Sequence, residues 1–219
     1  DYNFIIFSCL IFILGIFSDL GLMESPLKRF ILQSLVILGF LILYKTGIDS
    51  IRIEFLDYLM QNKVINLLFT TFCILIVING SNFMDGVNTL TAGYFMLVLL
   101  SLLLIFFNNQ IILLNFNLII ITTISLFVVF IFNIFGKIYL GDNGAYLIAF
   151  IVSIILIEAS KNNISISPYY VVNLLWYPAF EKTDSLYPYI DYADLRIEAI
   201  AKQINQSENF IKPVKNIKI

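Results

Sequence analysis

The sequence contains no histidine, and only 13% of its 219 residues are charged. A soluble globular domain carries about 25% charged residues, so this scarcity argues against one. Without histidine, the chain lacks the commonest general base and transition-metal ligand. The net charge is only −2, which gives no reason to expect a nucleic-acid partner. The two cysteines, Cys9 and Cys73, lie in apolar runs, and we expect small buried hydrophobes rather than disulfide or metal partners.

Apolar residues make up 60% of the chain. A charged residue at mid-bilayer costs about 2.5 to 3.5 kcal/mol, so membrane spans are best located by runs without charge. A helical span needs about 20 such residues, with a lower limit near 17. We therefore predict an all-α, polytopic transmembrane helical bundle of about seven spans, at residues 2–18, 30–44, 64–84, 91–107, 113–135, 143–157 and 162–180.

Two polar segments accompany these spans. Residues 48–63 have apolar positions mostly at helical spacing, which predicts an amphipathic helix at the membrane interface. The composition changes abruptly after Ala179, where no further apolar run of span length occurs. We therefore divide the chain into a transmembrane core, 1–181, and a polar cytosolic tail, 182–219, with a short amphipathic helix at 189–204.

The acidic residues that follow the spans are related by the number of crossings between them. Asp19 follows the first span, Asp85 comes two crossings later, Asp142 two crossings after that, and Glu181 two more. Because an even number of crossings returns the chain to the same membrane face, we predict that all four acids share one face. The alternative is that loops contain acids only because spans cannot.

The segment INGSNFMDGVNTLTAG, residues 78–93, combines polar side chains at helical spacing. Asn79, Asn82 and Asp85 recur every three residues, and Gly86 and Asn88 follow. Polar groups inside an uncharged environment are costly unless they bind something. Helix caps and a turn explain one or two of these residues but not the repeated spacing.

A second segment, KIYLGDNGAYL, places the Asp142-Asn143 pair between two glycines, directly before a span. The glycines allow a tight turn, and the amide groups at the start of the following helix can face an anion. An aspartate beside such a helix start suits a Mg²⁺ that also touches a phosphate. Taken alone the pattern is weak, because turns use these residues routinely.

In a third segment, residues 15–33, Ser25-Pro26 is typical of a helix start, with proline at the first helical position. Lys28 and Arg29 then lie at the membrane interface, where anchoring of the topology is favoured over catalysis.

Together these segments resemble the polyprenyl-phosphate N-acetylhexosamine-1-phosphate transferases, glycosyltransferase family 4, over about residues 4–181. The family includes the phospho-N-acetylmuramoyl-pentapeptide transferase and the undecaprenyl-phosphate N-acetylglucosamine-1-phosphate transferases. The motif N-x-x-N-x-x-D-G and the later G-D-x-G correspond to Asn79, Asn82, Asp85 and Gly86, and to Gly141, Asp142 and Gly144. The family's adjacent acidic pair corresponds to Ser18-Asp19, so the first acid is replaced here.

The resemblance implies transfer of a sugar phosphate from a UDP-amino sugar to undecaprenyl phosphate, with release of UMP, in cell-wall or surface polysaccharide synthesis. It implies a multi-pass protein of the bacterial cytoplasmic (inner) membrane, with the acid-bearing loops in the cytosol and a homodimer as one arrangement. It also implies Mg²⁺, with Mn²⁺ as an alternative, held by Asp142 and Asn82. The expected catalytic residues are Asp19, Asp85 and Asp142, and the expected substrate-binding residues are Asn79, Asn82, Asn88, Gly86 and Gly141. Asp19 is expected to position or deprotonate the lipid phosphate.

The chain also departs from the family pattern. The family's histidine-rich motif and its N-terminal spans have no counterpart here, and we expect a truncated member. Two alternatives follow. One is an ion-coupled secondary transporter whose Asn and Asp side chains coordinate an ion at broken helices. The other is a family member without catalytic activity.

Overall fold

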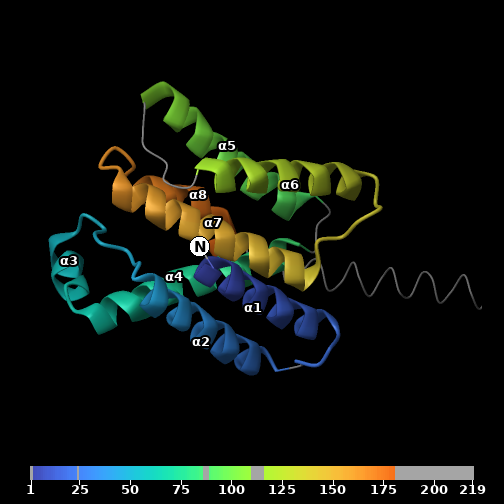
Figure 1. Cartoon of the computed structure of the whole chain (residues 1–219), viewed down its shortest axis with the longest axis horizontal. Helices are drawn as coiled ribbons and strands as arrows, with labels where there is room; N and C mark the ends of the chain where they lie inside the picture. The colour runs from blue at the N-terminus through green and yellow to red at the C-terminus, as the bar shows by residue number, and fades with distance from the viewer. Residues whose placement is uncertain (1, 24, 86–88, 110–115, 181–219) are drawn as a thin grey trace, which may run out of the picture. The chain divides into compact units, whose positions relative to one another are not determined.

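The computed structural model describes residues 2–23, 25–85, 89–109 and 116–180, and this part of the chain is all-helical (Figure 1). The predicted fold class, a polytopic helical bundle, is confirmed. The helices are α1 (Tyr2–Asp19), α2 (Pro26–Tyr44), α3 (Glu54–Met60), α4 (Lys63–Met84), α5 (Leu90–Asn109), α6 (Phe116–Ile134), α7 (Gly141–Asn162) and α8 (Pro168–Phe180). The predicted polar tail and its helix lie outside the described residues.

Six helices in the described part are long and apolar enough to cross a membrane, namely α1, α2, α4, α5, α6 and α7. We expected seven spans, and the last of them corresponds to α8, which has 13 residues. At a rise of 1.5 Å per residue, α8 reaches about 20 Å, less than the roughly 30 Å of the hydrocarbon core. The difference leaves the predicted face of Asp19, Asp85 and Asp142 unchanged, since α8 follows them in the chain, but it removes one of the two crossings on which the prediction for Glu181 depended.

Several helix boundaries follow the sequence signals. Ser25 is the N-cap residue of α2 and Pro26 its first helical residue, as predicted. α5 ends at Asn109, between the spans predicted at 91–107 and 113–135. α7 is longer than the uncharged run 143–157, because it continues through Glu158 and Lys161 to Asn162.

The interfacial helix predicted over residues 48–63 is shorter than expected. Only α3, Glu54–Met60, is helical, and it is followed at once by α4. The carboxylate of Asp57 accepts hydrogen bonds from the Ile51 N–H and the Ser50 hydroxyl, both at 2.7 Å. Arg52 has a φ of 63°, which an α-helix does not tolerate. Residues 45–53 therefore form a non-helical strap between α2 and α3.

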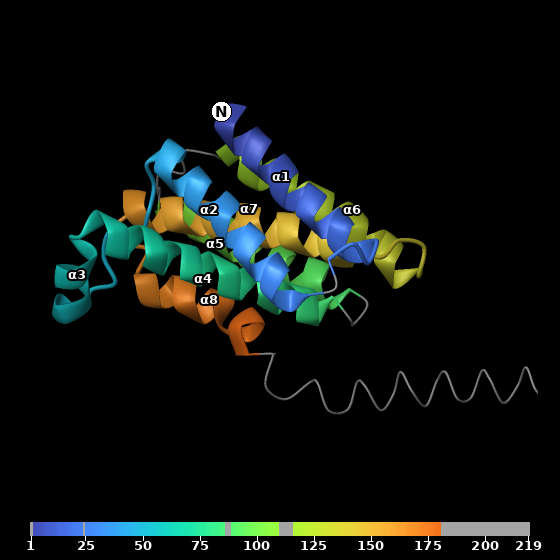
Figure 2. The same ribbon diagram turned by 90° about the horizontal axis from the view of Figure 1, so that it is seen from below.

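α7 is the central helix of the described part and has the largest number of buried residues. It packs against α1 and α4, and α2 and α8 pack against α4 (Figure 2). The rings of Phe40 on α2 and Phe150 on α7 are 5.2 Å apart, edge to face, in the middle of this core. Cys9, which we expected to be buried, is exposed on α1, and Cys73 is half-buried; both are free thiols.

Two glycines let these helices approach closely. A Cβ on Gly15 of α1 would collide with the backbone of Asn143 at the start of α7. A Cβ on Gly80 of α4 would collide with the carbonyl of Pro178 in α8. Glycine at these two positions therefore brings the C-terminal ends of α1 and α4 into the neighbourhood of α7 and α8.

Candidate active site

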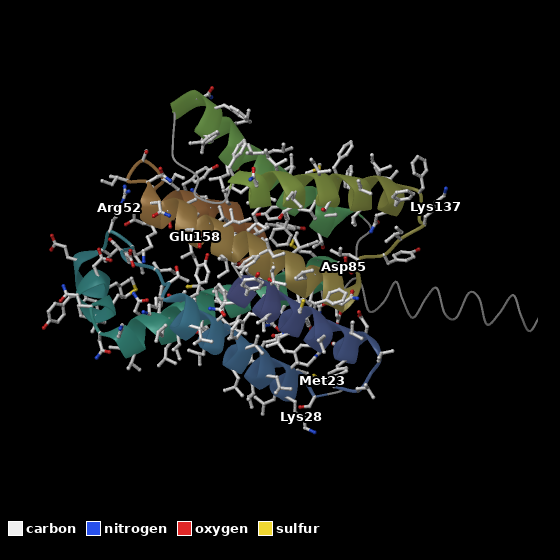
Figure 3. All side chains as sticks on the ribbon, viewed as in Figure 1. Met23, Lys28, Arg52, Asp85, Lys137 and Glu158 are labelled. Atoms are coloured by element: carbon white, nitrogen blue, oxygen red, sulfur yellow. The ribbon has the colours of Figure 1, made fainter. Side chains whose placement is uncertain are left out.

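Three helix ends meet at one end of the bundle. α1 ends at Asp19, Asp85 is the C-cap residue of α4, and α7 begins at Gly141, so that Asp142 lies in its first turn. Figure 3 labels Asp85 at this end and Arg52 and Glu158 toward the other. The predicted gathering of Asp19, Asp85 and Asp142 is therefore seen in the structure, and we call these residues the acidic cluster.

Asp19 closes the start of α7. Its carboxylate accepts the backbone N–H of Asp142 at 2.9 Å and that of Asn143 at 3.3 Å. The amide groups at a helix start have no intrahelical partner and carry a partial positive charge, so a carboxylate is stabilising there. We expected this helix start to face an anion, and within the described chain the anion is the side chain of Asp19.

Asp85 makes the second connection to the same loop. The backbone N–H of Gly141 donates to the Asp85 carboxylate, which joins the end of α4 to the start of α7. Burial, together with the negative charges of Asp142 and Asp19, raises the pKa of Asp85 to about 6, although the hydrogen bond from the Gly141 N–H opposes the change. The charges of Asp142 and Asp19 act on Asp85 because the three acids lie at the same end of the bundle.

Gly141 has a backbone conformation and a position that favour glycine. Its φ is +68°, in the left-handed region. A Cβ at this position would lie 3.1 Å from Asp19 Oδ2 and 3.1 Å from Asn143 Oδ1. The glycine that was predicted to allow a tight turn therefore also permits a close approach, by the Asp19 carboxylate.

Asp142 is bound by two residues that the sequence analysis did not assign to the site. Its Oδ2 atom accepts a hydrogen bond of 2.5 Å from the Ser18 hydroxyl and lies 3.4 Å from Nη1 of Arg29. The same Arg29 nitrogen donates to Ser18 Oγ at 2.8 Å. Arg29, which we interpreted as a topological anchor, is therefore a cation of the acidic cluster. Tyr146, one turn further along α7 and almost fully buried, interacts with Ser18 and Arg29.

The sequence carried one signal for Arg29. Ser25-Pro26 fixes the start of α2, and this start places Arg29 in the first turn of the helix, next to the end of α1. A basic residue at the start of a span is otherwise an ordinary interfacial anchor, so the pattern alone does not distinguish the two roles.

The predicted asparagines are placed differently. Asn79 and Asn82 lie on the last turns of α4, as the spacing requires. The Asn79 amide donates to the Leu75 carbonyl at 2.8 Å and to Gln33 Oε1 of α2 at 3.3 Å, so it connects α2 with α4. Asn82 is half-buried and is not among the hydrogen-bond partners of Asp142. The predicted substrate residues Gly86 and Asn88, and the acid Glu181, lie outside the described residues.

The donor atoms available for a metal are few. In the part of the chain that the structure describes, no three acidic, cysteine or histidine side chains are grouped to hold a metal ion. Mg²⁺ needs fewer, because it commonly binds one or two carboxylates and completes its six positions with water and substrate phosphate. Asp142 uses Oδ2 for Ser18 and Arg29, which leaves Oδ1 without a donor among the described residues. This set of oxygens is compatible with Mg²⁺ bound together with a phosphate-bearing substrate.

Comparison with known proteins gives one match. A family model described as "Glycosyl transferase family 4" matches residues 2–160, which include α1 to α6 and nearly all of α7. No curated protein matches the chain, and no solved structure does. The match contains the complete acidic cluster together with Ser18 and Arg29.

Proposed function

The chain belongs to glycosyl transferase family 4 and is a membrane protein, and on this basis we propose that it transfers an N-acetylhexosamine-1-phosphate from a UDP-sugar to undecaprenyl phosphate. The reaction takes place at the cytoplasmic face of the inner membrane. The observation that carries the proposal is the meeting of Asp19, Asp85, Asp142 and Arg29 at the ends of α1, α4 and α7 and the start of α2.

The proposed reaction is a phosphoryl transfer. An oxygen of the lipid phosphate forms a bond to the β-phosphorus of the UDP-sugar, and the bond between this phosphorus and the bridging oxygen breaks. The bridging oxygen leaves on UMP, and the product is a lipid-linked sugar diphosphate. Such transfers depend mainly on positioning and on neutralisation of phosphate charge. Arg29 supplies a fixed positive charge at the cluster, where its Nη1 already contacts Asp142 and Ser18.

Asp142 would hold Mg²⁺ through its Oδ1 atom, which accepts no hydrogen bond from the described residues, and we assign Asn82 as a second oxygen ligand. When bound, Mg²⁺ neutralises the diphosphate. Ser18 and Arg29 hold the other Asp142 oxygen in place, so that the available oxygen keeps a fixed direction.

Asp19 serves as a positioning residue in this scheme. A phosphate monoester has a second pKa of about 6 and is largely dianionic at neutral pH, so the lipid phosphate needs no strong base to become a nucleophile. The Asp19 carboxylate is already bound to two amide groups of α7. Its proposed contribution is to hold Asp142 and the G-D-x-G loop where the phosphates meet.

The position of the acids at helix ends favours this function over ion-coupled transport. An ion-coupled carrier binds its ion near the bilayer midplane. Asp85 caps the C-terminal end of α4, and Asp142 lies in the first turn of α7. Each of these two helices has 22 residues, so each acid lies at the end of its helix and not at the middle.

Product formation tests the proposal. The purified chain in detergent is supplied with undecaprenyl phosphate, Mg²⁺ and a UDP-sugar labelled in the sugar, and label in the butanol-extractable lipid is measured. UDP-N-acetylglucosamine is compared with UDP-N-acetylgalactosamine and with UDP-glucose. We expect label in the lipid with an N-acetylhexosamine donor and only in the presence of undecaprenyl phosphate. Transfer of label in the absence of undecaprenyl phosphate would contradict the proposal. The absence of transfer with every UDP-sugar donor would also contradict it.

A further inference from the structure

A second polar region lies at the opposite end of the spans from the acidic cluster. Here α2 ends at Tyr44, α4 begins at Lys63 and α7 ends at Asn162. α4 and α7 each have 22 residues, which corresponds to about 33 Å, or one membrane thickness. A hollow of about 380 Å³ lies between these ends and the strap of residues 45–53. We call it the lysine pocket.

The lysine pocket has more positive than negative charge. Three lysines line it, Lys45, Lys63 and Lys161, together with a single acid, Asp49. Asp49 forms an ion pair of 3.2 Å with Lys161. Within the described residues, Lys45 and Lys63 form no ion pair. Two positive charges that come from different helices therefore share one hollow without a counter-ion.

Both unpaired lysines stand where the local structure favours another residue. Lys45 is the C-cap residue of α2 with a φ of 54°, a left-handed conformation in which glycine is preferred and other residues are strained. Lys63 is the first residue of α4, where the helix dipole is positive and no acid occupies the first turn. A cation at a helix start is unfavourable by itself, and a bound anion would offset this cost.

Part of the remaining wall of the lysine pocket is apolar, and it continues along an exposed apolar face of α2. Leu41, Ile42 and Leu67 line the pocket. Leu35 and Ile31 lie on the same face of α2 as Ile42, seven and eleven residues before it, and Ile42, Leu35 and Ile31 are 58%, 60% and 48% exposed. A ligand that contacts both the lysines and this apolar face has an anionic head at the membrane surface and an apolar tail along α2.

We propose that the lysine pocket binds the phosphate headgroup of an anionic phospholipid on the membrane face opposite the acidic cluster. Lys45 and Lys63 neutralise the headgroup, and its acyl chains lie against Ile42 and Leu35 of α2. Free phosphate shares the headgroup chemistry but lacks the tail, and zwitterionic lipids share the tail but lack the net negative charge.

Lipid titration of the purified full chain tests the assignment. Native mass spectrometry measures binding of the first molecule of phosphatidylglycerol, of phosphatidylcholine and of inorganic phosphate. We expect phosphatidylglycerol to bind at least tenfold more tightly than phosphatidylcholine. The double variant Lys45→Gln/Lys63→Gln is expected to lose this preference, because each lysine near an anionic headgroup contributes substantially to binding.

The matched control is Lys28→Gln/Lys137→Gln, which removes two lysines at the other end of the molecule (Figure 3) and is expected to keep the preference. Lys63→Gln alone leaves α2 unchanged and is expected to give a partial loss, so the test does not depend on folding of the double variant. Undiminished preference in both lysine-pocket variants, equal loss in the control, or equally tight binding of inorganic phosphate would overturn the proposal.

Discussion

The carboxylate of Asp19 accepts the backbone N–H of Asp142 at 2.9 Å, although 123 residues separate the two in the chain. The contact joins the end of the first span to the start of the sixth. Asp142 is held from its side chain as well, by Ser18 and Arg29. The position of the proposed metal-binding carboxylate is therefore determined by residues of α1 and α2, at a distance along the sequence.

Removal of the Asp19 carboxylate should destabilise the fold as well as the site. Asp19→Ala leaves two amide groups of α7 without their acceptor, and loss of such a helix cap costs about 1 kcal/mol. We expect a lower melting temperature in detergent, with Asp19→Asn intermediate because it keeps one acceptor oxygen. As a control, Asp49→Ala breaks an exposed ion pair and should change the melting temperature less. Equal melting temperatures for Asp19→Ala and wild type would show that the cap does not stabilise α7.

The guanidinium of Arg29 should contribute to activity more than the neighbouring ammonium of Lys28. A hydrogen bond to a charged group is worth about 1.5 to 3 kcal/mol, so Arg29→Gln should lower the transfer rate by roughly tenfold to a hundredfold. Arg29→Lys keeps the charge but loses the planar fork, and we expect an intermediate rate. Lys28→Gln is the matched control and should transfer at nearly the wild-type rate. Equal losses in the two glutamine variants would return Arg29 to the role of a membrane anchor.

A methyl group at Gly141 should harm the site beyond its effect on the backbone. Gly141 and Gly136 have similar φ values, +68° and +63°, so alanine pays a similar conformational cost at both positions. Only at Gly141 does the added Cβ meet the Asp19 carboxylate, since nothing lies within 4 Å at Gly136. We expect Gly141→Ala to lose most of the transfer activity and Gly136→Ala to retain it. Parallel losses of activity would mean that the approach to Asp19 is unimportant.

The raised pKa of Asp85 predicts a pH dependence of stability. Its pKa is about 6 in the folded chain, against an ordinary value of 3.8, so the folded state binds more protons between these values. Stability from this group is therefore greatest below pH 3.8 and falls as the pH rises through 6. Asp85→Asn should melt at a higher temperature than wild type at pH 7.5, and the difference should disappear toward pH 4.

Asp57 is a control of opposite sign for this experiment. Hydrogen bonds from the Ile51 N–H and the Ser50 hydroxyl lower the pKa of Asp57 below 3.8. The stability that the Asp57 carboxylate contributes is present above pH 3.8 and is lost as the pH falls through the lowered pKa. Asp57→Asn should therefore melt below wild type by a constant amount between pH 5 and 8. A pH-independent difference for Asp85→Asn would contradict the assigned burial of that carboxyl.

The helical class and the meeting of the three acids could be predicted from the sequence, because charge-free runs locate spans and an even number of crossings fixes the face. The contacts that arrange the acids could not. Ser18 and Arg29 approach Asp142 only through the packing of α1 against α7 and α2, which single-residue patterns do not encode. Likewise, the spacing of Asn79 predicted its helical face but not its hydrogen bond to Gln33. The length of α3 could not be predicted either, because the Asp57 side chain binds the backbone and hydroxyl groups of the preceding strap, which is not helical.

The most direct test of the account is Mg²⁺-dependent UMP release by the wild-type chain and by Asp142→Asn. The assay supplies undecaprenyl phosphate and UDP-N-acetylglucosamine, and Asp49→Asn, an acid at the opposite end of the spans, is the matched control. The account predicts UMP release that stops when Mg²⁺ is chelated, falls roughly a hundredfold or more in Asp142→Asn, and is unchanged in Asp49→Asn. Release by Asp142→Asn at the wild-type rate, or no release by the wild-type chain beside an active relative, would contradict it.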